Sequence, residues 1–374
     1  MKRITSLFLA LFMAPFAVAG FSLFAQDKDT KTFAVSKGGT FELDTKAGEV
    51  AASVWDKNEI SVTVEYMENA DKQYLSMTQT GNNVRVSFQP PELRPRNRIQ
   101  FRLSIPAEFN LDLRTGGGKV MMASQQSIVG KVRILTGGGE IEIGDVNGDV
   151  NLHTGGGDIQ TGALAGNADL SAGGGNVRCG FISGAASIRT GGGNIASRGA
   201  AKDLNISTGG GAINIEEAGA NAIATTGGGN LSVNKSFGKL TLSTGGGAIS
   251  VRNANGDLSV TTGGGNLTFE NVTGSINGHT GAGGINAEIS PVNKDTSLET
   301  GAGDIDLGLP ASAKATVLAR IESRMPHDES DITSEFGAPE KGSSNHEKTF
   351  LTNGGGPRII LETKVGKIRI RKTT

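Results

Sequence analysis

The sequence predicts an all-β protein: a single-chain parallel β-solenoid (β-helix) with two short strands in each 18-residue coil, capped at both ends by less regular β structure. Two observations predict this fold. Glycine occurs 57 times in 374 residues, about twice the usual share, and many of these glycines fall in triplets that recur at one fixed spacing. Between the triplets, apolar and polar residues alternate as in strands, without the 3.6-residue period of a helix.

The glycine triplets define the repeat. A degenerate copy, GAGG, begins at Gly281, an earlier triplet begins at Gly116, and a GAG begins at Gly301. A single unit of this length cannot bury an apolar face alone, but stacked units can. The period therefore predicts coils that lie on one another at the strand spacing of about 4.8 Å. The triplets that follow each other at this fixed period without an insertion begin at Gly137, Gly155, Gly173, Gly191, Gly209, Gly227, Gly245 and Gly263.

Two apolar columns in each repeat predict the strands. The fourth residue after the first glycine is apolar in every copy, as at Ile141 and Ile159, and a second apolar pair lies half a repeat away, as at Val150 and Leu152. The residue between the members of a pair is mostly polar, so one side of each strand is expected inside. We expect ladders, with Ile on Ile inside and Asn or Ser on Asn outside. Cys179, the only cysteine, has an inward position and is expected to be a buried, inert thiol.

The glycine triplets are interpreted as corners of the coil. TGGGKV at 115–120 is not a P-loop, because Val120 follows the lysine and strands are expected on both sides of the loop. An 18-residue period also leaves no room for the helix of a dinucleotide-binding motif. A calcium-binding repeat needs an acidic ladder, but the residue after the triplet is acidic only in the first two 18-residue copies, at Glu140 and Asp158. Glycine instead permits a sharp turn and a close approach of backbones. Threonine precedes every triplet of this series except at Ala172, and we expect its hydroxyl to point inward and satisfy backbone groups of the turn. An ice-binding array would need outward threonines on a flat face.

The two ends of the chain differ from the repeats. Residues 1–25 have a basic start, an apolar run and then small residues, which predicts a signal peptide and an exported protein, in the periplasm or at the cell surface. Residues 26–113 are predicted to be an N-terminal β cap, 114–309 the glycine-rich solenoid, and 310–374 a C-terminal cap of strands and a polar loop, with the last strands at 357–372. No second apolar stretch is long enough to span a membrane. The basic stretch PPELRPRNR at 90–98 is the best candidate for a partner contact, against a merely solvated loop.

The histidines and the overall charge favour neither a metal site nor a polyanion. His153 and His279 share an outward column but lie seven periods apart, and His327 and His346 fall in a polar C-terminal stretch. We therefore expect no metal and no cofactor. The chain has 36 basic and 37 acidic residues, and this balance gives no reason to expect nucleic acid as a partner.

Three carboxylates are the one candidate for catalysis. Glu140, Glu142 and Asp158 can gather on one face of adjacent coils, and paired carboxylates are the catalytic groups of glycosidases. A solvated face is the competing interpretation and is the one we prefer, because the repeats contain few aromatic or basic residues to complete an active cleft. No catalytic residue is therefore predicted.

Four motifs resemble a known family. FAVSKGGTFELDTKAGEV, IQFRLSIPAEFNLDLRTGGGKV, the repeated TGGG and the closing GGGPRIILETKVGKIRIRK resemble the "putative adhesin" family of bacterial β-strand-repeat proteins, a domain of unknown function. The resemblance covers residues from about 32 to 372, and its motifs are structural rather than chemical. It implies an exported β-solenoid of the bacterial envelope and supplies no catalytic residues.

These observations predict a non-enzymatic, exported β-solenoid of the cell envelope with a role in adhesion, binding or scaffolding. Its partner is expected to be an envelope or surface ligand, either a protein or a glycan. Two alternatives stay open: a carbohydrate-active solenoid enzyme, and a filament that self-assembles through the ends of the solenoid.

Overall fold

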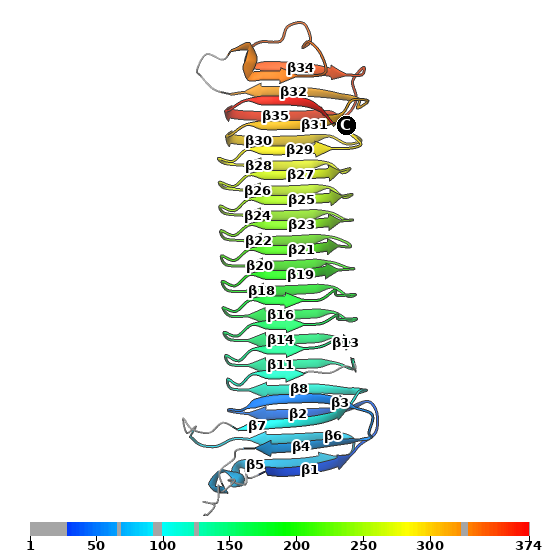
Figure 1. Cartoon of the computed structure of the whole chain (residues 1–374), viewed down its shortest axis with the longest axis vertical. Helices are drawn as coiled ribbons and strands as arrows, with labels where there is room; N and C mark the ends of the chain where they lie inside the picture. Colours follow the sequence, from blue (N-terminus) through cyan, green and yellow to red (C-terminus); the bar gives the residue numbers. More distant parts are fainter. Residues whose placement is uncertain (1–27, 66–68, 93–98, 123–126, 323–327, 374) are drawn as a thin grey trace, which may run out of the picture.

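The computed structural model describes residues 28–65, 69–92, 99–122, 127–322 and 328–373. The predicted signal peptide, His327 and residues 93–98 of the basic stretch lie outside the described residues. Figure 1 shows a rod of stacked strand coils. Within the described ranges the only helices are two short 3₁₀ helices, η1 (Asn69–Tyr74) and η2 (Glu329–Asp331). Accordingly, no helix there has the length and apolar character needed to cross a membrane.

Two long sheets run the length of the rod, and each coil contributes one strand to each. Along the coils, sheet A contains β9 (Val120–Met122), β12 (Ile141–Ile143), β15 (Ile159–Thr161), β17 (Val177–Cys179), β19 (Ile195–Ala200), β21 (Ile213–Ala218), β23 (Leu231–Ser236), β25 (Ile249–Ala254), β27 (Leu267–Val272), β29 (Ile285–Ile289) and β31 (Ile305–Pro310). Sheet B contains β8 (Phe109–Thr115), β11 (Val132–Thr136), β14 (Val150–Thr154), β16 (Ala168–Ala172), β18 (Ala186–Thr190), β20 (Leu204–Thr208), β22 (Ala222–Thr226), β24 (Leu240–Thr244), β26 (Leu258–Thr262), β28 (Ile276–Thr280) and β30 (Thr296–Ala302).

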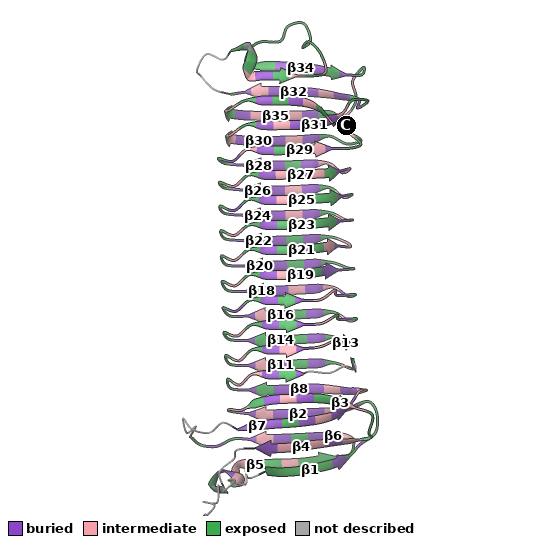
Figure 2. Ribbon diagram, in the orientation of Figure 1, coloured by how far each residue is buried: buried purple, intermediate pink, exposed green. Residues whose placement is uncertain are grey.

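The pairing between coils is parallel and keeps the register of the repeat. Ile141 pairs with Ile159 in sheet A, and Val150 pairs with Ala168 in sheet B. The predicted parallel β-solenoid is therefore confirmed. Buried and exposed residues alternate along the strands (Figure 2), because successive side chains of a strand point to opposite faces. The inward columns of the two sheets form one continuous apolar core, and Cys179 is buried in it as predicted.

The first coils have a short third side. β10 (Ile128–Val129) pairs in parallel with β13 (Val146–Asn147). Single bridges continue this ladder from Val146 to Leu164, Ile182 and Ala200, and all four residues are buried. The sheet A strands of these coils, β12, β15 and β17, are only three residues long, whereas β19 to β27 have six. The cross-section of the rod therefore changes along its length.

At the N-terminal end, strands from early in the sequence lie between later ones. Sheet A continues outward from β9 through β3 (Glu49–Trp55), β7 (Gln100–Pro106), β4 (Glu59–Glu65) and β1 (Lys28–Ala34), and the last two pairings are antiparallel. Sheet B continues outward from β8 through β2 (Gly39–Thr45), β6 (Asn83–Phe88) and β5 (Leu75–Thr80), with an antiparallel last pair. The coil formed by β2 and β3 thus stacks directly on β8 and β9.

The C-terminal end is built by the same kind of insertion. β35 (Arg358–Val365) pairs with β30, and β32 (Ala315–Ile321) and β34 (Glu347–Thr352) lie beyond it in sheet B. In sheet A, β36 (Ile368–Thr373) pairs with β31, and β33 (Ile332–Ser334) lies beyond it. Residues 357–372 do form the last strands of the sequence, as predicted. However, they continue the regular coils, and the strands that precede them in the chain lie farther out on the rod (Figure 1).

A lysine is buried at this C-terminal end. Lys348 of β34 is 9% exposed, and its Nζ donates a hydrogen bond to the backbone carbonyl of Ile332 at 3.0 Å. The two residues belong to the outermost described strands of the two sheets. An inward charge on an edge strand disfavours pairing with another chain.

Candidate binding surfaces

The glycine corners are held by a ladder of threonine hydroxyls. The Thr208 hydroxyl accepts a hydrogen bond from the Gly211 amide in its own triplet at 3.2 Å and donates one to the Gly193 carbonyl of the previous coil at 2.8 Å. The same pair of bonds occurs at Thr154, Thr190, Thr226, Thr244, Thr262 and Thr280. The prediction that these threonines point inward and satisfy the turn is confirmed.

The first and third glycines of a triplet are required by the stacking of the coils. A Cβ added at Gly209 or Gly211 would collide with the backbone carbonyl of Gly191 or Gly193 in the previous coil. A Cβ on the middle glycine, Gly210, would meet only open space. The sequence agrees, because the degenerate copies that begin at positions 281 and 301 carry alanine only in the middle. The triplet is therefore a corner at which the backbones of successive coils lie too close together for a side chain.

A second ladder of side-chain oxygens runs beside the corners. Asp158 Oδ1 accepts a hydrogen bond from the Asn176 amide at 2.7 Å, and Asn176 Oδ1 accepts one from the Asn194 amide at 2.9 Å. Asn194 continues the pattern to Ala212 at 2.8 Å. This confirms the predicted outer ladder of Asn on Asn, and it assigns the Asp158 carboxylate a structural bond.

The other two candidate carboxylates are also engaged. Lys119 Nζ lies 3.1 Å from Glu140 Oε2 and 3.2 Å from Glu142 Oε2. The hydrogen bonds to Glu140 and Glu142 raise the pKa of the Lys119 ammonium, although burial opposes this. The lysine therefore remains charged and offsets part of the negative charge of the two carboxylates. Glu140 and Asp158 occupy equivalent positions in successive coils, so the predicted proximity on adjacent coils is correct.

His153 and His279 lie far apart on the rod. His153 is in β14 and His279 in β28, with seven coils of register between them, as predicted. His279 Nδ1 lies 3.3 Å from Glu299 Oε2, and both side chains are half-buried. Within the described ranges, no group of three or more His, Cys, Asp or Glu residues is arranged to hold a metal ion.

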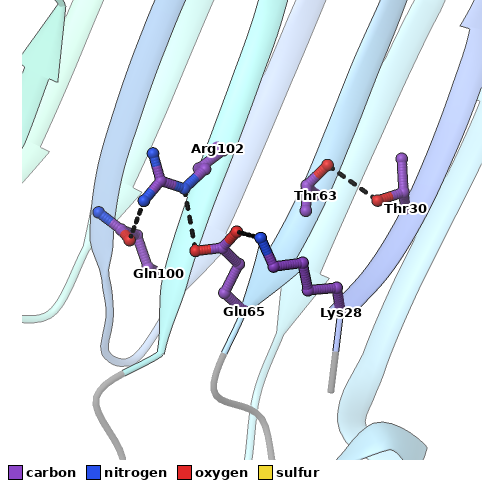
Figure 3. A network of polar contacts seen from close by, with 6 residues as sticks. All are labelled: Lys28, Thr30, Thr63, Glu65, Gln100 and Arg102. Carbon is purple, nitrogen blue, oxygen red and sulfur yellow. Dashed lines mark hydrogen bonds and ion pairs between the residues drawn. The ribbon is translucent and has the colours of Figure 1, made fainter. Parts of the chain in front are cut away.

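A charged network that the sequence did not reveal joins three strands of the N-terminal end (Figure 3). Glu65 of β4 is 3% exposed; its two carboxylate oxygens lie 2.7 Å from Lys28 Nζ of β1 and 2.9 Å from Arg102 Nε of β7. Arg102 also donates to Gln100 Oε1 at 3.0 Å. The hydrogen bonds from Lys28 and then Arg102 hold the pKa of the Glu65 carboxyl below its usual value. These residues fasten the outermost strands of sheet A to one another, a structural role.

Comparison with known proteins supports the family resemblance. Residues 187–371 match the family model described as Toastrack DUF4097. This part of the chain is similar to the Toastrack DUF4097 family. No curated protein matches the chain. Similar solved structures include a putative adhesin from Bacteroides fragilis (13% identity, 63% of this chain and 97% of that chain covered, TM-score 0.37). They also include a putative adhesin from Parabacteroides merdae (14%, 70% and 95%, TM-score 0.36) and a putative lipid binding protein from Parabacteroides distasonis (16%, 75% and 96%, TM-score 0.28).

The two outer faces of the rod differ in charge within residues 187–371. On sheet A, exposed ion pairs join neighbouring coils, such as Arg252 with Glu270 at 3.1 Å. On sheet B, the outward side chains from β20 to β28 are uncharged until His279, and nearly all carry a hydroxyl or an amide. These residues, which we call the hydroxyl–amide face, are Asn205, Ser207, Ile223, Thr225, Thr241, Ser243, Ser259, Thr261 and Asn277.

Proposed function

We propose that the protein is an exported, non-enzymatic rod of the bacterial cell envelope that binds or scaffolds other envelope components. The hydroxyl–amide face carries this proposal. Its donors and acceptors repeat in register from coil to coil, because each outward residue pairs with its equivalent in the next coil. A repeating row of neutral hydrogen-bonding groups suits an extended partner, a surface protein or a glycan, better than a small substrate.

The balance of contacts favours this function over the glycosidase alternative. A glycosidase needs one carboxyl group free to protonate the leaving group and another free to attack or to activate water. Glu140 and Glu142 are instead paired with Lys119, and the Asp158 carboxylate accepts a hydrogen bond from the backbone amide of Asn176. In this proposal residues 114–309 carry the binding faces, while 26–113 and 310–374 cap the rod.

The proposal also places the chain outside the cytoplasm. The basic and apolar character of residues 1–25 supports export, and the Toastrack match at 187–371 is compatible with a structural module. We propose the periplasm or the cell surface as the location. The balanced charge gives no electrostatic reason for nucleic acid to be a partner.

A deletion strain tests the function. The strain is compared with wild type and with a complemented strain for surface attachment and for sensitivity to detergent. Added protease on intact cells separates surface exposure from a periplasmic location. Equal attachment and equal detergent resistance in all strains would contradict an envelope role. Hydrolysis of a polysaccharide panel by the purified protein, abolished by Asp158→Asn, would establish the enzyme instead.

A further inference from the structure

A groove on sheet A arises where a column of side chains is missing. In the register of the repeat, the outward position of Arg198 and Glu216 is occupied by glycine in the preceding coils, at Gly162 and Gly180. The chain turns inward at these glycines after the three-residue strands β15 and β17, toward the buried third side of the coils. A Cβ at Gly180 would meet the backbone of Gly162, so the turn requires glycine. The result is a hollow of about 610 Å³.

The groove is long and polar. Its lining spans five successive coils, from Asp145 at one end to Glu216 at the other. One wall includes Gln160, Arg178 and Asn214, which belong to a single column of the repeat. A groove elongated along the rod in this way matches a linear chain rather than a compact molecule.

Arg178 provides a cation that the protein does not use. Four of the five arginines between residues 116 and 309 lie within 4.0 Å of a carboxylate oxygen, for example Arg189, which lies 3.9 Å from Asp169 Oδ1. Arg178 is exposed and has no such partner among the described residues. Its planar guanidinium can form two parallel hydrogen bonds with one carboxylate. A ligand carboxylate is therefore the group that this wall recognises best.

The rest of the lining selects among acidic chains. Asp145 lies at one end of the groove and would repel a ligand that is negatively charged along its whole length. At the other end the charge of Glu216 is offset by Arg198, whose Nε lies 4.0 Å from Glu216 Oε2. The same carboxylates accept hydrogen bonds from hydroxyl groups, and the amides of Gln160 and Asn214 can both donate and accept. Half-buried Phe181 adds an apolar surface, on which the C–H face of a sugar ring can pack.

We propose that this groove binds a linear polysaccharide in which neutral sugars separate the carboxylate-bearing ones, and that Arg178 holds a sugar carboxylate. The assignment rests on the proposed envelope function and names the ligand of a second binding surface, on sheet A. The lining combines one unpaired cation, neutral amides, the Arg198–Glu216 ion pair and the carboxylate of Asp145. This pattern matches isolated negative charges separated by hydroxyl-rich sugars.

Calorimetric titration of the purified protein with a hyaluronan octasaccharide tests the site. This probe alternates acidic and neutral sugars, and its methyl ester removes the charge but keeps the chain. We expect binding of the octasaccharide and at least tenfold weaker binding of the ester. We expect Arg178→Gln to weaken binding of the octasaccharide at least tenfold, whereas Arg189→Gln, the matched change on sheet B, leaves it unaltered. Equal thermal unfolding of the two variants confirms that both are folded.

Three results would overturn the proposal: no binding of the octasaccharide by the unaltered protein, equal binding by the Arg178 and Arg189 variants, or equal binding of the ester. Binding of poly-L-glutamate with the same dependence on Arg178 and tighter than the octasaccharide would assign the groove to an acidic peptide instead. Envelope phenotypes of the deletion strain are scored separately. If the deletion strain has an envelope phenotype but the protein does not bind hyaluronan, only the proposed ligand is rejected. If the protein binds hyaluronan but the deletion strain has no envelope phenotype, only the envelope role is rejected.

Discussion

Replacing Ala172 with threonine is expected to stabilise the rod, because this coil lacks one rung of the threonine ladder. In the next coil, the Thr190 hydroxyl accepts a hydrogen bond from its own triplet at 3.3 Å and donates one to the previous coil at 2.6 Å. Alanine has no hydroxyl, so the Gly175 amide and the Gly157 carbonyl lack this partner. The Gly175 residue is buried, and a buried amide without a partner destabilises the folded state.

The expected gain follows from the two missing bonds. A hydrogen bond contributes a net ~0.5–1.5 kcal/mol, so two contribute roughly 1–3 kcal/mol. Ordering the threonine side chain reduces this by less than about 1 kcal/mol. We expect the free energy of unfolding to rise by about 1–2 kcal/mol.

Urea unfolding and amide hydrogen exchange measure the effect. Exchange at the Gly175 amide is expected to slow about fivefold or more in Ala172→Thr, since a change of one or two kcal/mol alters an equilibrium by a factor of roughly 5–30. Ala172→Val is the matched control, because valine has the shape of threonine without the hydroxyl. The reverse change, Thr208→Val, is expected to lower stability by about 2 kcal/mol, since it leaves two backbone groups without a partner.

The reasoning about the hydroxyl is refuted if Ala172→Thr and Ala172→Val slow exchange at Gly175 equally, because burial alone would then explain the gain. It is also refuted if Ala172→Thr is less stable than the natural chain. That result would show that this coil has no room for a branched side chain.

The remaining predictions concern a corner, an end and the core. Gly210→Ala is expected to leave the midpoint of urea unfolding unchanged within experimental error. Gly211→Ala is expected to unfold the corner, because its Cβ would meet the Gly193 carbonyl. Equal midpoints for the two variants would contradict this. Lys348→Leu removes the inward charge at the C-terminal edge, so light scattering is expected to detect concentration-dependent association that the unaltered chain lacks. Burial raises the pKa of the Cys179 thiol to about 11. The thiolate is therefore scarce at pH 8, and a thiol reagent is expected to react only in denaturant; rapid labelling of the folded chain at that pH would show that the site is open.

The repeat was predictable because its signals are local and regular. These signals are the triplets at one spacing, the alternation of apolar residues such as Ile141, and the threonine before every 18-residue corner but one. All of them follow from the demands of a single coil. Identical coils stack in register, so one coil determines the next. The inward Cys179 and the separation of His153 from His279 followed from the same register.

The sequence by itself therefore determined the solenoid, its register and the identity of its ladders. Only the tertiary structure decided what depends on contacts between distant segments. Four strands pair in the sheets with strands that are distant in the sequence. They are β2 and β3 at the N-terminal end and β35 and β36 at the C-terminal end. The ion pairs of Glu65 likewise join residues that the fold brings together, Lys28 and Arg102. Whether Arg178 has a partner also depends on which residues lie beside it on neighbouring coils. A periodic pattern specifies what repeats, whereas caps and grooves form where the period breaks and long-range packing selects the arrangement.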